Sequence, residues 1–155
     1  PILLQLYFFW IFLPRVLPVK ISDSSCIIIA LIINASSYVA EVIRAGIQAV
    51  DKGQTEAARS LGMTGSHTMT QIILPQAIKN ILPALGNEFI TMIKQASLAS
   101  VFFINELTTS YKTISSATFR PVEALMIAGI IYLLVTTVLG KIMEYAEWRM
   151  NRNER

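Results

Sequence analysis

The chain has 155 residues, of which 54% are hydrophobic and 15% are charged, and its formal net charge is +3. Soluble domains carry about 25% charged residues, so this composition favours a membrane protein. The positive charge is too small to indicate nucleic acid, and one cysteine with one histidine excludes an internal disulfide and a Cys/His metal cluster.

The first segment, PILLQLYFFWIFLP, is apolar but shorter than the roughly 20 residues that a membrane-spanning helix needs. It has no basic start and no small-residue cleavage site, so it is not typical of a signal peptide. We expect Pro14 and then Pro18 to close its helix. Because the chain opens at Pro1 inside an apolar run, we also expect it to be truncated at its N-terminus, with further membrane helices upstream.

The second segment, residues 24–46, has the length of a membrane span. Its first half is apolar, whereas its second half carries Asn34, Glu41 and Arg44 on one helix face. Polar groups in a spanning helix are costly and usually face a bundle interior or a wet cavity. Two interpretations stay open: Glu41 pairs with Arg44 at the membrane edge, or this part of the helix, with Tyr38, lines a transport path.

Residues 47–82 are more polar and contain GQTEAARSLGMTGSHTMTQIILPQA, which has the pattern helix, glycine, helix. We expect a first helix over about 55–61 and a chain reversal with positive φ at Gly62. The stretch GMTGS should start a second helix, which Pro75 should stop or bend before the next membrane segment.

This hairpin could dock on another protein, lie on the lipid surface as an amphipathic connector, or bind DNA as a helix-turn-helix. The small Ala57 and Ala58 would let the backbone of a partner approach closely, and Glu56 suits the positive end of a helix. A DNA-reading helix needs cationic side chains for the phosphates, but the expected second helix has only His67. The sequence therefore favours protein docking over DNA binding.

A third candidate span covers residues 83–104. Asn87, Thr91 and Lys94 follow one face of its expected helix at positions i, i+4 and i+7. Because a lone lysine deep in lipid is expensive, Lys94 must pair with Glu88 or reach a water-filled path.

A polar loop rich in Ser and Thr is expected over residues 105–121, and a last span over 122–143 precedes a polar tail. The 47–82 stretch and the tail share one side of the membrane and carry seven basic residues, against four in the opposite loops. The positive-inside rule therefore places both in the cytoplasm. The seven are Lys52, Arg59, Lys79, Lys141, Arg149, Arg152 and Arg155, and the four are Arg15, Lys20, Lys112 and Arg120.

A membrane enzyme built on Glu41, Glu88 and His67 is the competing class of function. Its carboxylates would lie on separate helices at different depths, and no nucleophile–base spacing is visible. The chain also has no P-loop of the form GxxxxGK[ST], so we do not expect it to hydrolyse ATP itself.

The hairpin and its neighbours resemble the permease subunits of ATP-binding cassette importers, which carry an EAA signature. The residues that carry the signature are Glu56, Ala57, Ala58, Gly62, Leu74 and Pro75. The flanking phrases SYVAEVIRAGIQAV, LPQAIKNILPALGNEFI and IKQASLASV are similar to polar amino acid permeases of the histidine, glutamine and arginine type. The resemblance covers nearly the whole chain. Asp51, where the family usually has Pro, and Ala96, where Thr is usual, depart from it.

The resemblance implies an all-α, polytopic membrane bundle: one permease domain over residues 1–155, with a cytoplasmic coupling loop over about 47–82. Such a subunit translocates polar amino acids across the bacterial plasma membrane and binds no cofactor or metal itself. The implied partners are ATPase subunits that bind ATP–Mg, a second permease subunit (identical or not) and an external amino-acid-binding protein. The lipid bilayer surrounds the subunit, and nucleic acid is not a partner.

The sequence thus gives two sets of candidate site residues, neither of them catalytic. The resemblance assigns coupling to the ATPase to the six signature residues named above. The polar residues of the candidate spans are the candidates for the translocation path, and they are Asn34, Tyr38, Glu41, Asn87, Glu88, Thr91 and Lys94.

Overall fold

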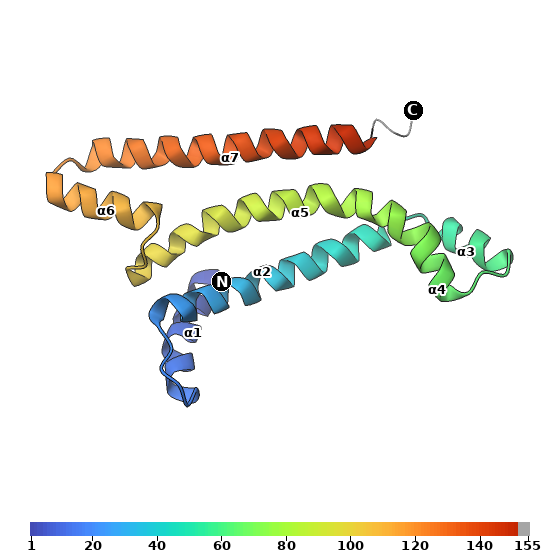
Figure 1. Ribbon diagram of the computed structural model, residues 1–155, viewed down its shortest axis with the longest axis horizontal. Helices are drawn as coiled ribbons and strands as arrows, with labels where there is room; N and C mark the ends of the chain where they lie inside the picture. Colours follow the sequence, from blue (N-terminus) through green and yellow to red (C-terminus); the bar gives the residue numbers. More distant parts are fainter. Residues whose placement is uncertain (152–155) are drawn as a thin grey trace. The chain divides into compact units, whose positions relative to one another are not determined.

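The all-helical fold predicted from the sequence is confirmed in the computed structural model, which describes residues 1–151 (Figure 1). The orientation count used Arg152 and Arg155, which lie outside the described residues. A π-helical turn, η1 (Met69–Ile73), and a 3-10 helix, η2 (Ser97–Phe102), interrupt the α-helices. The α-helices are α1 (Ile2–Val16), α2 (Asp23–Gln48), α3 (Lys52–Ser60), α4 (Gly65–Thr68), α5 (Leu74–Ala96), α6 (Leu107–Thr118) and α7 (Pro121–Asn151).

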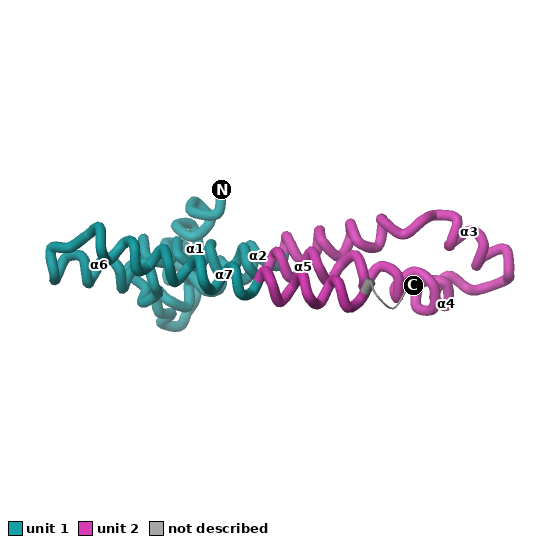
Figure 2. Tube along the Cα trace, turned by 90° about the horizontal axis from the view of Figure 1, so that it is seen from above, with its two compact units in different colours: residues 1–36, 90–139 teal, residues 37–89, 140–155 magenta. Residues whose placement is uncertain are grey.

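The chain divides into two units (Figure 2). Unit 1 contains residues 1–36 and 90–139, and unit 2 contains residues 37–89 and the chain from residue 140 onward. The long helices α2, α5 and α7 each have one part in unit 1 and the other in unit 2. Unit 1 also holds α1, η2 and α6, whereas unit 2 holds the α3–α4 hairpin.

Two of the described helices are long and apolar enough to cross a membrane, by length and composition. They are Asp23–Gln48 and Pro121–Met150, with mean hydropathy of 2.1 and 2.2. Only 22% and 11% of their most apolar windows are buried. Both therefore leave most of their apolar surface exposed, as expected for contact with lipid and unlike the core helix of a soluble protein.

The third span expected over residues 83–104 is corrected by the structure. α5 begins at Leu74 and ends at Ala96, so Pro83 lies inside the helix rather than at its start. From Ser97 the backbone tightens into η2, and its C-cap residue, Phe103, lies in the left-handed region with φ 55°. The apolar run continues through both helix types, which is why hydropathy alone does not reveal the change.

The loop expected over residues 105–121 is also wrong, because most of it forms α6. The carboxylate of Glu106 caps this helix, accepting the backbone N–H of Thr108 at 2.8 Å and of Thr109 at 2.6 Å. Serine and threonine favour loops because their hydroxyls compete for backbone groups. In α6 these hydroxyls bond the helix's own carbonyls instead, as Thr113 does to Thr109 O at 3.0 Å.

α1 continues past Pro14, the first of the two prolines expected to close it, and stops at Val16, before Pro18. The next residue, Leu17, is extended, with φ −79° and ψ 135°. Pro18 accounts for this conformation, because a proline pushes the residue before it out of the helical region.

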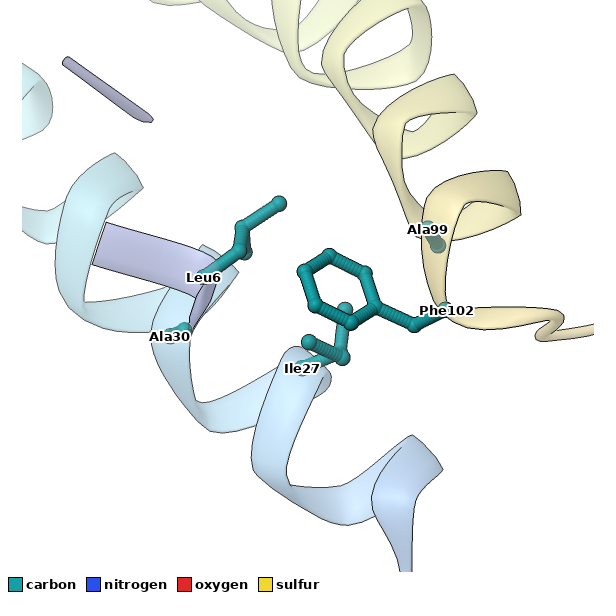
Figure 3. Packing of buried hydrophobic residues seen from close by; sticks show 5 residues of the cluster. All are labelled: Leu6, Ile27, Ala30, Ala99 and Phe102. Carbon is teal, nitrogen blue, oxygen red and sulfur yellow. The ribbon is translucent and has the colours of Figure 1, made fainter. Parts of the chain in front are cut away.

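In unit 1 a small core joins α1, α2 and η2 (Figure 3). Leu6 comes from α1, Ile27 and Ala30 from α2, and Ala99 and Phe102 from η2. Figure 3 shows the Phe102 ring between Leu6 and Ile27. The alanines leave room for the large side chains, so three elements distant in sequence are fixed together.

In unit 2 the end of α2 packs against η1 and the start of α5. The buried residues of this cluster, which we call the hairpin base, are Val50, Ile73, Ala77 and Ile81. Gly46 on α2 lies so close to Ile81 that a Cβ at this position would overlap the Ile81 side chain. The close approach of these two helices therefore depends on the missing side chain of Gly46.

We predict that Gly46→Val lowers the melting temperature of the purified protein, because overpacking costs about 1–3 kcal/mol. Combining it with Ile81→Ala should recover part of the loss, since that change removes the overlapping atoms. Thermal unfolding of the single and double variants checks this. A melting temperature unchanged by Gly46→Val would contradict the close packing.

Candidate coupling hairpin and translocation path

The first helix of the hairpin begins earlier than the sequence predicts. Asp51 caps α3, and its Oδ1 accepts the backbone N–H of Gly53 at 2.7 Å. Glu56 therefore lies in the second turn of α3. The prediction that it lies at the positive end of the helix is wrong. The signal for the cap was present, since Asp51 and Gln54 have the spacing of a capping box.

The reversal at Gly62 is confirmed, with φ 83°. Gly62 N–H donates to Arg59 O at 3.0 Å, and Met63 N–H donates to Ala58 O at 3.1 Å. These two bonds form a Schellman motif, which satisfies carbonyls at the end of α3. The reversal therefore needs a residue that tolerates the left-handed region, and glycine does so without strain.

The second helix starts as expected, within GMTGS. Thr64 is its N-cap, and its hydroxyl accepts the backbone N–H of His67 at 3.3 Å. The hydroxyl of Thr68, which is buried, donates back to Thr64 O at 3.0 Å. Both ends of the turn are thus closed by local hydrogen bonds, which makes the hairpin tip a defined structure.

Of the two outcomes that the sequence predicts at Pro75, a stop or a bend, the structure excludes the stop. The backbone stays helical from α4 through η1 into α5. Leu74 N–H donates to Met69 O, five residues back, as in a π-helix. A proline lacks an N–H and clashes with the carbonyl four residues earlier. The wider π turn directly before Pro75 relieves this conflict, so the helix continues into the membrane segment.

The signature residues differ in how far their side chains are exposed to solvent. Glu56 and Ala57 are exposed, whereas Ala58 is buried and holds the hairpin together rather than offering a surface. Leu61, which sequence reasoning missed, is 84% exposed at the tip beside Gly62. A large apolar side chain in a polar hairpin is the signal that could have identified it.

On α2, the pairing of Glu41 with Arg44 is confirmed at 3.8 Å. Both side chains are about 70% exposed, so the ion pair contributes little to stability. Tyr38 is exposed. Asn34 is half-buried, and its Nδ2 donates to Gln5 Oε1 on α1 at 2.9 Å. The structure thus brings Asn34 to a partner that sequence spacing could not indicate.

On α5, the Lys94–Glu88 pair considered from the sequence is not formed. Glu88 Oε1 is buried and has no hydrogen-bond partner among the described residues, while Lys94 is exposed. Six positions separate them, which turns the two side chains about 120° apart around the helix. Asn87 is exposed and Thr91 is half-buried on the same helix.

Two buried polar atoms of the described chain lack a partner, and both belong to candidate path residues. They are Asn34 Oδ1 and Glu88 Oε1. Buried polar groups are usually hydrogen-bonded, so an orphaned acceptor indicates a place that takes up a donor from water or a ligand.

Comparison with known proteins relates this geometry to a family. Residues 1–152 match the family model of the binding-protein-dependent transport system inner membrane component. The chain belongs to this family. The all-α fold and the multi-helix membrane character predicted from the sequence agree with it, and the match does not support a DNA-binding protein.

Curated members of the family are similar over most of the chain. The nopaline transport system permease protein NocM of Agrobacterium fabrum is 46% identical over 84% of this chain and 54% of its own length. The arginine transport system permease protein ArtQ of Bacillus subtilis is 40% identical over 93% of this chain and 67% of its own length. The chain therefore spans about half to two thirds of these relatives.

A solved structure gives the same picture of the fold. The crystal structure of an amino acid ABC transporter with histidines matches with a TM-score of 0.90 and 47% identity. The match covers 96% of this chain and 69% of that chain. Nearly all of the described arrangement is therefore shared with a solved family member.

We predict that Lys94→Met leaves the melting temperature nearly unchanged, because an exposed side chain without an acidic partner contributes little. Glu88→Leu should raise stability by on the order of 1 kcal/mol, since it removes a buried acceptor that lacks a donor. Thermal unfolding measures both. A loss of stability in Lys94→Met that Glu88→Leu restores would instead establish a Lys94–Glu88 pair.

Proposed function

We propose that this chain is part of the membrane-spanning permease subunit of an ATP-binding cassette importer that carries polar amino acids across the bacterial plasma membrane. The observation that carries the proposal is the α3–α4 hairpin, which is closed by its own hydrogen bonds and seated on the hairpin base. Membership in the family and the names of the relatives support it.

The hairpin would dock on a separate ATPase subunit. Glu56, Ala57 and Leu61 are among its exposed residues, and together they offer a carboxylate, a small surface and an apolar tip. The sequence has no P-loop, so ATP–Mg belongs to that ATPase. A second permease subunit and an external amino-acid-binding protein complete the proposed complex. The count of basic residues supports a cytoplasmic hairpin.

The structure offers a physical route for coupling. The last part of α2 and the first part of α5 meet at the hairpin base. Gly46 and Ile81 bring the two helices into close contact there. A displacement of the hairpin by the ATPase would therefore move both helices together, because packed interiors shift as units rather than deforming. Such movement of α2 and α5 would alternate access to the path.

The two orphaned acceptors support a path for polar amino acids. Asn34 Oδ1 and Glu88 Oε1 would accept hydrogen bonds from an ammonium group or from water as the substrate passes. Polar groups within apolar helices are costly, so their presence favours a role in transport.

The proposal is tested with the complete transporter, isolated from its native membrane and reconstituted in proteoliposomes with its ATPase and binding protein. We expect one or a few polar amino acids, among arginine, histidine and glutamine, to stimulate ATP hydrolysis and to accumulate inside. Stimulation by no amino acid, or ATP hydrolysis by the permease alone, would contradict the proposal.

We predict that Glu56→Lys and Leu61→Ser each reduce co-purification of the ATPase, because the first reverses a charge and the second removes the apolar tip. Gly62→Val should do the same by blocking positive φ, whereas Gly62→Asn, which tolerates the left-handed region, is the matched control. Membrane insertion should be normal in all four. Normal co-purification and uptake in the first three would rule out docking through the hairpin.

A further inference from the structure

A pocket of about 530 Å³ lies in unit 1 between η2 and α6, and neither the hairpin residues nor the candidate path residues line it. Its volume is within the range of small-molecule sites. The residues that line it are Ser100, Phe103, Thr109, Lys112, Thr113, Ser116 and Ala117. Lys112 is the only charged residue among these seven, so the pocket is suited to an anion.

The ammonium group of Lys112 is held in place by η2. Its Nζ donates to Ser100 Oγ at 3.2 Å and lies 3.5 Å from Ser100 O. Ser100 is buried, so it provides a fixed anchor for the flexible lysine. An ammonium group has three N–H donors, and this tether leaves at least one of them for a ligand.

Ser116 supplies a second donor beside Lys112. The two residues are four positions apart and lie on the same face of α6. The hydroxyls of Thr109 and Thr113 are already engaged with Ile104 O at 2.6 Å and Thr109 O at 3.0 Å. No described residue accepts the hydroxyl hydrogen of Ser116. An ammonium group and a hydroxyl that line one pocket match the two oxygens of a carboxylate.

Phe103 forms the aromatic part of the lining. It is 88% exposed and has φ 55°, a conformation that is unfavourable for a bulky residue. Strain of this kind persists where the surrounding structure imposes it, often at ligand sites. An aromatic face attracts cations, so the lining offers a partner for the ammonium group of a zwitterion as well as for its carboxylate.

The nearby carboxylate of Glu106 does not compete for the ligand. It accepts two backbone N–H groups at the start of α6 and the hydroxyl of Tyr132 at 3.1 Å. These donors hold the carboxylate at the start of α6, and the bond to Tyr132 also fixes the helix that carries Lys112 to α7. Glu106 does not line the pocket, so Lys112 remains the charged residue of the lining.

We propose that this pocket binds the carboxylate of the transported amino acid at the external side of the membrane. Lys112 and Ser116 hold the carboxylate, and Phe103 faces the ammonium group. The inference rests on the proposed function for the substrate class, and on the count of basic residues for the side of the membrane. The pocket would receive the amino acid before it reaches the path.

A cysteine at Ala117, which lines the pocket without a polar role, tests binding directly in the reconstituted transporter carrying Cys26→Ala. An impermeant thiol reagent should label it only from outside, and Thr64→Cys only from the opposite side. L-Histidine should slow labelling of the cysteine at position 117, whereas histamine, which lacks the carboxylate, should not. L-Arginine and agmatine form a second such pair.

Lys112→Met should raise the histidine concentration needed for half-maximal protection by about tenfold or more, since it removes a charge-assisted hydrogen bond. Lys112→Arg should largely preserve protection. Equal protection by histidine and histamine, or protection unchanged in Lys112→Met, would overturn the site.

Transport kinetics separate this site from docking of the binding protein. Lys112→Met should lower the maximal uptake rate and leave the half-saturating concentration of loaded binding protein unchanged. A raised half-saturating concentration with intact histidine protection would assign Lys112 to docking and refute the proposal. Normal amino acid uptake without any Lys112 effect would refute this site alone, while uptake of no amino acid would refute the proposed function.

Discussion

The rest of the structure depends on the close contact between the end of α2 and the start of α5. This contact is possible because Gly46 has no side chain where Ile81 lies against it. Val50, Ile73 and Ala77 complete the cluster and are all buried. A polar hairpin with few apolar residues of its own could not hold a fixed position without such a base. The packing therefore gives the hairpin a fixed position on α2 and α5.

Some features of the hairpin are determined by local chemistry and others by tertiary packing. Asp51 and Thr64 cap its two helices, and Gly62 provides the left-handed residue that the Schellman motif needs. None of these features requires the rest of the chain. The burial of Ala58 is different, because it depends on the reversal that brings the chain back across α3. Only the exposed residues of the hairpin remain available for contact with another protein.

Polar side chains in unit 1 are organised around α6. Composition alone does not reveal these contacts. Glu106 begins the helix and bonds Tyr132 on α7, and Ser100 fixes Lys112. Each of these groups would be costly near lipid if left alone. Paired in this way, they hold the amphipathic helix α6 against the apolar elements η2 and α7. One cationic pocket stays open between η2 and α6.

The sequence by itself determined the all-α class, the apolar helices α2 and α7 and the reversal at Gly62. These follow from periodicity, hydropathy and the conformational freedom of one glycine, all of which act within a few residues. Only the tertiary structure decided that α5 runs through Pro75, because a π turn before a proline leaves no mark in composition. It likewise decided that Asn34 bonds Gln5 on α1, a partner far away in sequence. Which buried polar atom finds a partner depends on segments far away in sequence, and local patterns carry no information about those contacts.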